Sequence, residues 1–173
     1  MQFSLNNSPK LGRTQLILID GPSGAGKTTL AKQLQSELAA PIIHLEFLYN
    51  GWDDALTSTL TNNLVSLCNS IKSGQDHFLP IYNWQTKTFD STKIISPTPK
   101  LIIEGVGAGQ SAIRSFASAL IWVDADPEIA LARVMQRDGF NYPDEISRWK
   151  IREAAHFKLE QTAKFADFHY LTS

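Results

Sequence analysis

The chain of 173 residues has a hydrophobic fraction of 43% and a charged fraction of 19%, which are ordinary for a globular protein. This length suits one domain with a sizeable core, so we expect residues 1–173 to form a single domain. The formal net charge of −1 at pH 7 argues against nucleic acid or an anionic membrane as a partner, because no overall basic field attracts them.

The start of the chain carries no targeting pattern. Residues 1–15 lack an apolar stretch of signal-peptide length, and no later run approaches the roughly 20 apolar residues that cross a bilayer. The cluster Asn6-Asn7-Ser8-Pro9 is typical of a loose tail, which we place at residues 1–13. These observations predict a cytoplasmic protein without a membrane partner, and they leave a homo-oligomer open.

A strand, a glycine-rich loop and a helix follow one another near the N-terminus. The apolar run at 16–19 is typical of a strand buried on both faces. Residues 21–28 read GPSGAGKT and fit the pattern G-x-x-x-x-G-K-[ST]. Leu30, Leu34 and Leu38 then share one helical face. This setting indicates a phosphate-binding loop rather than a chance glycine-rich turn.

The predicted loop explains how a nucleoside triphosphate would bind. Glycines let successive amides point inward at an anion, and the helix that follows adds its positive dipole end. The Lys27 ammonium can reach the β- and γ-phosphates, and the Thr28 hydroxyl can ligate Mg²⁺. We therefore predict ATP and Mg²⁺ as cofactors, with nucleotide contacts from Gly21, Ser23, Gly24, Ala25, Gly26, Lys27, Thr28 and Thr29.

Strands and helices alternate along the rest of the chain. Further strands are expected at 42–45, 101–105, 120–124 and 169–171, with extended pieces at 81–84 and 87–89 that could form a hairpin. Helices are expected from a cap at Asp53 or Asp54 to Gly74, at 111–116, at 126–139 and at 143–165. Alternation predicts an α/β fold with a parallel sheet, whose ligand lies beyond the carboxyl ends of the strands.

Polar side chains at those strand ends are candidates for the site. Asp20, Glu46, Glu104 and Asp124 all fall at strand ends, so we expect several of them to face the phosphates. The single Cys68 is expected to be a buried apolar filler, because one cysteine forms neither an internal disulfide nor a thiolate zinc site. The four histidines show no metal-ligand spacing, so structural or solvated roles are expected for them.

Six segments together carry a resemblance to a known family. They read GPSGAGKTT, HLEFLYNGW, LIIEGVG, WVDADPE, ARVMQRDG and FADFHY in chain order, and they span nearly the whole chain. They resemble the uridine kinase-like branch of P-loop kinases. The resemblance implies a three-layer P-loop NTPase fold with a five-stranded parallel sheet in the order 2-3-1-4-5 and with a mobile lid.

The resemblance also assigns roles to individual residues. The family's general base is an Asp, and the matching position here is Glu46, one methylene longer. Glu104 matches the carboxylate that supports Mg²⁺, directly or through water. Arg133 and Arg137 match the lid arginines that clamp the transferring phosphate, so the implied catalytic set is Lys27, Glu46, Arg133 and Arg137. The alternatives are a solvated strand end for each carboxylate and a solvated helix face for the arginines.

The acceptor is a small molecule whose identity the sequence leaves open. Aromatic side chains, among them Tyr49, Tyr82 and Trp84, could stack a nucleobase or could equally be packing. The resemblance favours phosphoryl transfer to a hydroxyl of a pyrimidine nucleoside such as uridine or cytidine. One alternative is a nucleoside monophosphate kinase, which would need further arginines, available at 114, 148 and 152. Another is a non-catalytic nucleotide-binding module.

Overall fold

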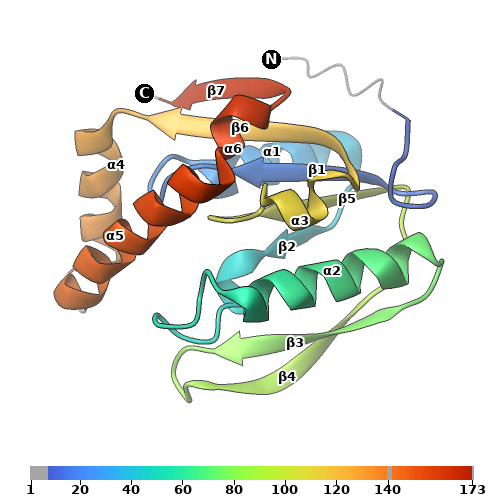
Figure 1. The fold of residues 1–173 in the computed structure, drawn as a ribbon, viewed down its shortest axis with the longest axis horizontal. Coiled ribbons are helices and arrows are strands. Elements are labelled where there is room, and N and C mark those ends of the chain that lie inside the picture. The colour runs from blue at the N-terminus through green and yellow to red at the C-terminus, as the bar shows by residue number, and fades with distance from the viewer. Residues whose placement is uncertain (1–7, 140–141, 173) are drawn as a thin grey trace.

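The computed structural model describes residues 8–139 and 142–172, which form a layered α/β structure (Figure 1). Its centre is a parallel sheet made of β1 (Gln15–Asp20), β2 (Ile42–His44), β5 (Lys100–Glu104), β6 (Ala117–Ala125) and β7 (Phe168–Thr172). The strands lie side by side in the order β2-β5-β1-β6-β7, and every neighbouring pair is parallel. Numbered along the chain within this sheet, that order is 2-3-1-4-5, so the predicted topology is confirmed.

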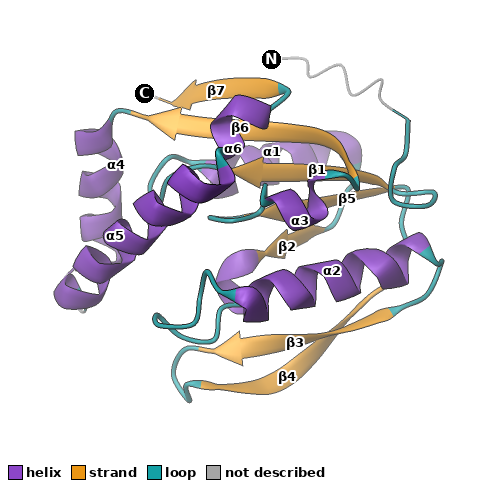
Figure 2. Ribbon diagram, in the orientation of Figure 1, coloured by secondary structure: helices purple, strands orange, loops and turns teal. Residues whose placement is uncertain are grey.

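Helices cover both faces of the sheet, as Figure 2 shows. They are α1 (Lys27–Leu38), α2 (Ser58–Lys72), α3 (Ser111–Arg114), α4 (Pro127–Val134), α5 (Pro143–Glu160) and α6 (Thr162–Phe165), with short 3₁₀ and π turns at Leu45–Phe47 and Met135–Gly139. In the part of the chain that the structure describes, no helix is long and apolar enough to span a membrane. The arrangement of one sheet between two layers of helices confirms the predicted three-layer α/β fold.

Two apolar cores lie on opposite faces of the sheet because successive strand residues alternate between faces. In β1, Leu16 and Leu18 join the core that contains Leu60 and Leu64 of α2. Ile17 and Ile19 point to the other side, where Leu30 and Leu34 of α1 complete the second core. The apolar run at 16–19 is therefore continuous because helices cover this sheet on both faces.

Helix boundaries differ from the prediction, and at two of them a single local residue accounts for the difference. The second helix begins after Thr57, whose hydroxyl accepts the Thr59 amide, so neither Asp53 nor Asp54 is its cap. The helix predicted over 143–165 breaks at Gln161, where φ is 50° and α5 ends. In both cases a local polar or left-handed residue outweighed apolar periodicity.

The N-terminal segment and the hairpin also depart from expectation. The expected loose tail is wrong for its described end, because Leu11 is fully buried and its main chain pairs with that of Thr14; residues 1–7 lie outside the described residues. The two extended pieces form an antiparallel hairpin longer than predicted, with β3 at His77–Asn83 and β4 at Thr88–Ile95. This hairpin packs beside α2 (Figure 1).

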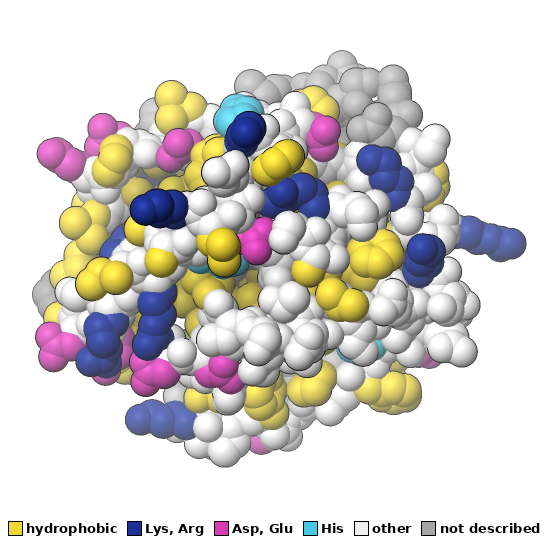
Figure 3. Space-filling model, in the orientation of Figure 1, with side chains coloured by type: hydrophobic (Ala, Val, Ile, Leu, Met, Phe, Trp, Pro, Cys, Tyr) yellow, Lys and Arg dark blue, Asp and Glu magenta, His cyan; other side chains and the backbone are white. Residues whose placement is uncertain are grey.

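Charged side chains of both signs are interspersed on the face of the molecule shown in Figure 3. Among the described residues on this face, Lys and Arg side chains do not form a continuous stripe.

Candidate functional site

The glycine-rich loop connects β1 to α1 at the carboxyl edge of the sheet. Gly21 has φ 145° and Gly24 has φ 83°, and a Cβ atom at either position would meet a main-chain oxygen, that of Val123 or Ala130, at 1.9 or 2.1 Å. Only glycine fits such contacts. The tight curl of the loop therefore depends on its packing against β6 and α4 as well as on its own sequence.

Two carbonyls of the loop bond to other elements, and several of its amides are available. Arg133 of α4 donates to the Gly24 oxygen at 3.2 Å, and Thr172 of β7 donates to the Ala25 oxygen at 2.9 Å. Within residues 8–139 and 142–172, the amides of Gly24, Gly26, Lys27 and Thr28 donate no hydrogen bond. Such amides at a helix N-terminus form an anion-binding cradle.

Lys27 lies against the loop that it follows. Its Nζ donates to the carbonyl oxygens of Gly21 and Pro22 at 2.7 and 2.8 Å, and its side chain is buried. Burial lowers the pKa of Lys27, while the carboxylates of Asp20 and Glu104 act in the opposite direction. The ammonium is thus held where the phosphates would lie.

A hydroxyl and a carboxylate meet beside the loop. Thr28 Oγ1 donates to Glu104 Oε1 at 3.0 Å, and Nδ1 of His44 lies 2.6 Å from the same oxygen. Glu104 ends β5 and is paired in register with His44 at the end of β2. Hard oxygen ligands of this kind fit Mg²⁺, which is usually bound by one or two protein groups together with substrate phosphates. The contact between His44 and Glu104 is absent from the sequence interpretation.

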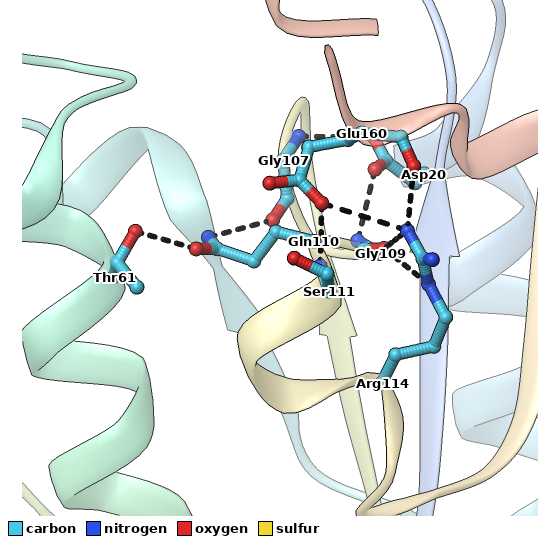
Figure 4. Close-up of polar contacts among 8 residues, drawn as sticks. All are labelled: Asp20, Thr61, Gly107, Gly109, Gln110, Ser111, Arg114 and Glu160. Atoms are coloured by element: carbon cyan, nitrogen blue, oxygen red, sulfur yellow. Dashed lines mark hydrogen bonds and ion pairs between the residues drawn. The ribbon is translucent and has the colours of Figure 1, made fainter.

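Asp20 does not face the phosphates. It is fully buried and accepts the amide of Gly21 at 2.8 Å. It also accepts the amides of Gly107 and Gly109 at 3.0 and 2.9 Å (Figure 4). Burial raises the pKa of Asp20, and these amides together with Lys27 counteract the rise. Asp20 therefore ties the loop after β5 to the start of the phosphate loop, which corrects part of the expectation for the four strand-end carboxylates.

The other three strand-end carboxylates divide between the site and local capping. Asp124 accepts the amide of Ala125 at 2.9 Å, and it is not among the residues that line the site cavity. Glu46 and Glu104 do line this cavity. Two of the four carboxylates therefore share a cavity with the phosphate loop, and that they face the phosphates stays a prediction.

The cavity has a volume of about 550 Å³ and joins the phosphate loop to an aromatic region. Its lining combines basic, acidic and aromatic side chains. The charged lining residues are Lys27, Arg133, Arg137, Glu46, Glu104 and Asp138, and the aromatic ones are Tyr49, Trp52, Trp84, Tyr142 and Trp149. A site that combines a phosphate cradle with an aromatic wall can hold a nucleotide tail beside a second small molecule.

Both predicted lid arginines reach this cavity. Arg133 contacts the loop through Gly24 and also donates to Thr172 Oγ1 at 3.0 Å. Arg137 pairs with Asp138 at 2.7 Å, and that hydrogen-bonded partner raises its pKa. Glu46 is exposed in the 3₁₀ turn Leu45–Phe47 on the same cavity. The predicted catalytic residues are therefore near one another, and their roles stay predictions.

The predicted aromatic contacts are only partly at the cavity. Tyr49 lines it, although the Tyr49 hydroxyl donates to the Val106 carbonyl at 2.8 Å. Trp84 lines it and donates through Nε1 to the Glu46 carbonyl at 3.0 Å. Tyr82 is buried against Trp84 and Phe89 and is not among the lining residues. We therefore assign Tyr82 to packing.

Residues 17–150 match the AAA domain family model (AAA_18), which covers more than half of the chain. The chain belongs to this family. The matched residues of this chain include the phosphate loop, Glu104, Arg133 and Arg137.

The chain is also similar to the phosphoribulokinase of Synechocystis sp. (strain ATCC 27184 / PCC 6803 / Kazusa). The two are 26% identical over an alignment 162 residues long, and the match covers 83% of this chain and 49% of that phosphoribulokinase. The chain spans about half the length of the curated relative it matches.

Solved structures share the fold. A structure from Bacillus stearothermophilus described as a possible uridine kinase matches with a TM-score of 0.63 at 23% identity, covering 91% of this chain and 88% of that one. A structure from Silicibacter sp. TM1040, described as a candidate fructose transport system kinase, has a TM-score of 0.71 at 17% identity, covering 91% and 89%. The resemblance to the uridine kinase-like branch of P-loop kinases is thus confirmed at the level of fold.

Proposed function

We propose that this AAA domain protein is an ATP- and Mg²⁺-dependent kinase that transfers a phosphoryl group to a hydroxyl of a small molecule. The observation that carries the proposal is that the phosphate loop, the Thr28–Glu104 pair and the Glu46 carboxylate line one cavity. The similarity to phosphoribulokinase and to kinase structures supports it. Its location in the cytoplasm and its assembly state stay predictions.

Phosphoryl transfer requires positioning and neutralisation of charge more than covalent chemistry. Loop amides and Lys27 would bind the triphosphate. Arg133 and Arg137 would contact the phosphoryl group during its transfer. Mg²⁺ held by Thr28 and Glu104 would supply further neutralisation of the phosphates. Glu46 would orient the acceptor hydroxyl and accept its proton.

We propose an unphosphorylated acceptor with a planar group, because aromatic side chains line the cavity, and the family resemblance makes a pyrimidine nucleoside our candidate. The spare arginines are engaged elsewhere: Arg114 by Gly109 and Glu160, Arg148 by Glu145, and Arg152 by Trp52 and Asp53. None of these three arginines lines the cavity. An acceptor phosphate would instead meet Glu46, which repels it, so a nucleoside monophosphate is the weaker candidate.

A coupled ADP-release assay tests the proposal. The protein is supplied with ATP and Mg²⁺ and with uridine, cytidine, their monophosphates or other hydroxylated metabolites, and the control reaction lacks an acceptor. We expect release that depends on a nucleoside and stops when the metal is chelated. Release with monophosphates alone would favour the nucleotide kinase. Release that ignores every acceptor would favour a nucleotide-binding module.

A further inference from the structure

Helix α5 contacts the phosphate loop at one residue, Ser23. The indole Nε1 of Trp149 donates to Ser23 Oγ at 2.7 Å. The Ser23 amide donates to Glu153 Oε1 at 2.6 Å. Lys150 Nζ lies 3.4 Å from the Ser23 carbonyl oxygen. All three polar groups of one loop residue are therefore engaged by a helix more than 120 positions further along the chain.

The contact from Glu153 is notable because this carboxylate is only 4% exposed. Burying a carboxylate is unfavourable unless it is paired and hydrogen-bonded. Here one oxygen accepts the Ser23 amide and the other lies 3.0 Å from Lys150 Nζ. The buried residues of α5 are Ile146, Trp149 and Glu153, so a charged side chain interrupts an otherwise apolar face where the loop approaches.

Trp149 touches the loop and the acceptor side at once. Its ring lines the cavity, with its centroid 5.4 Å from that of Tyr49 and 6.2 Å from that of Trp52. In a transfer reaction the terminal phosphate must lie between the loop and the acceptor. Ser23, held against an aromatic residue of the acceptor side, therefore marks the end of the loop at which the terminal phosphate would lie.

We propose that Trp149 and Glu153 are positioning residues that hold Ser23 so that the loop is preformed at the terminal phosphate. Lys150 neutralises the carboxylate that this arrangement places near the nucleotide. A loop that is already ordered loses less conformational freedom when the phosphate binds, which strengthens binding. The proposal deepens the proposed function by rationalising where the transferring group is held.

Binding measurements without an acceptor test the proposal. Calorimetry with Mg²⁺ compares adenylyl imidodiphosphate, which keeps a third phosphate, with ADP, which lacks it. We expect Trp149→Phe and Ser23→Ala each to raise the Kd for the triphosphate analogue about fivefold, the effect of losing one neutral hydrogen bond. The Kd for ADP should change by less than about twofold. For the triphosphate analogue, the Kd of the double variant should equal that of whichever single variant binds it more weakly, because both substitutions remove the same hydrogen bond.

Trp122→Phe is the matched control, because it removes an indole N–H that lies 3.4 Å from Asp124 outside the cavity lining. It should leave the ratio of the two Kd values unchanged. Equal weakening of both nucleotides, or independent losses in the double variant, would overturn the proposal. If the protein phosphorylates no acceptor in the ADP-release assay, the proposed kinase function is wrong. The ratio of the two Kd values still tests whether Trp149 and Glu153 position Ser23.

Discussion

Lys27 is a buried ammonium that its own loop holds near the predicted phosphates through two carbonyl oxygens. We expect Lys27→Ala to lower kcat at least about 100-fold, as the loss of a preorganised charge at a transferring group does. Lys32→Ala on the exposed side of the same helix is the control and should retain activity. Steady-state ADP release measures both, and near-normal turnover by the Lys27 variant would contradict the role assigned to the loop.

Glu46 can be tested by a substitution that preserves its shape. Glu46→Gln keeps a hydrogen-bonding side chain but cannot accept a proton, so kcat should fall about 100-fold or more while the Kd for ATP stays the same. Glu37→Gln, which changes an exposed carboxylate on α1, should behave as the wild type. Unchanged transfer in the glutamine variant would remove Glu46 from the mechanism.

Residues of the site differ in how visible they are in the sequence. The loop residues could be predicted because their spacing is local and their chemistry is contained in eight consecutive positions. Glu153 and Trp149 could not, because only the folded chain brings them to Ser23. In the case of His44, its contact with Glu104 becomes foreseeable once the register of β2 and β5 is known.

At the scale of elements, the hairpin formed by β3 and β4 places Trp84 beside the turn that follows β2. Its indole N–H holds the Glu46 carbonyl, and its ring lies 5.2 Å from that of Trp52. We expect Trp84→Phe to raise KM for the acceptor about fivefold through loss of one hydrogen bond, with KM for ATP unchanged. Trp122→Phe again serves as control. An effect on KM for ATP alone would place Trp84 outside the acceptor region.

The helices illustrate where periodicity succeeds and fails. Leu60, Leu64 and Leu67 of α2 recur at helical spacing in the sequence, and they form part of its buried face. The segment after Val134 was expected to continue as one helix, yet it forms a π turn over Met135–Gly139 next to the cavity. Such turns are often found at functional sites, and apolar spacing alone does not reveal them.

For the whole molecule, Cys68 reports on global opening because it is fully buried on α2. Burial raises the pKa of this thiol to about 12, so it stays protonated in the folded protein. At pH 8 we expect a thiol reagent to react only through unfolding, and MgATP at about 100 times its Kd should slow labelling about 100-fold. Labelling at a rate independent of MgATP would contradict this expectation.

The same shift implies a pH dependence of stability. The folded-state pKa of Cys68 exceeds that of the unfolded thiol, which is about 8.5. As pH rises above that lower value, the unfolded chain loses its proton while the folded chain keeps it, so stability should decline. Chemical denaturation at pH 7.5 and pH 10 would measure the change, with Cys68→Ala as the control that lacks this contribution.

The sequence by itself determined the phosphate loop, the alternation of strands and helices and, through a family resemblance, the order of the central sheet. Those features depend on local spacing and on backbone geometry that neighbouring residues specify. Only the tertiary structure decided that Asp20 accepts hydrogen bonds from glycine amides, that Tyr82 packs against other aromatic rings and that α5 contacts Ser23. The reason is physical: a buried polar group must find its partners wherever the fold brings them, and those partners lie far away in the sequence.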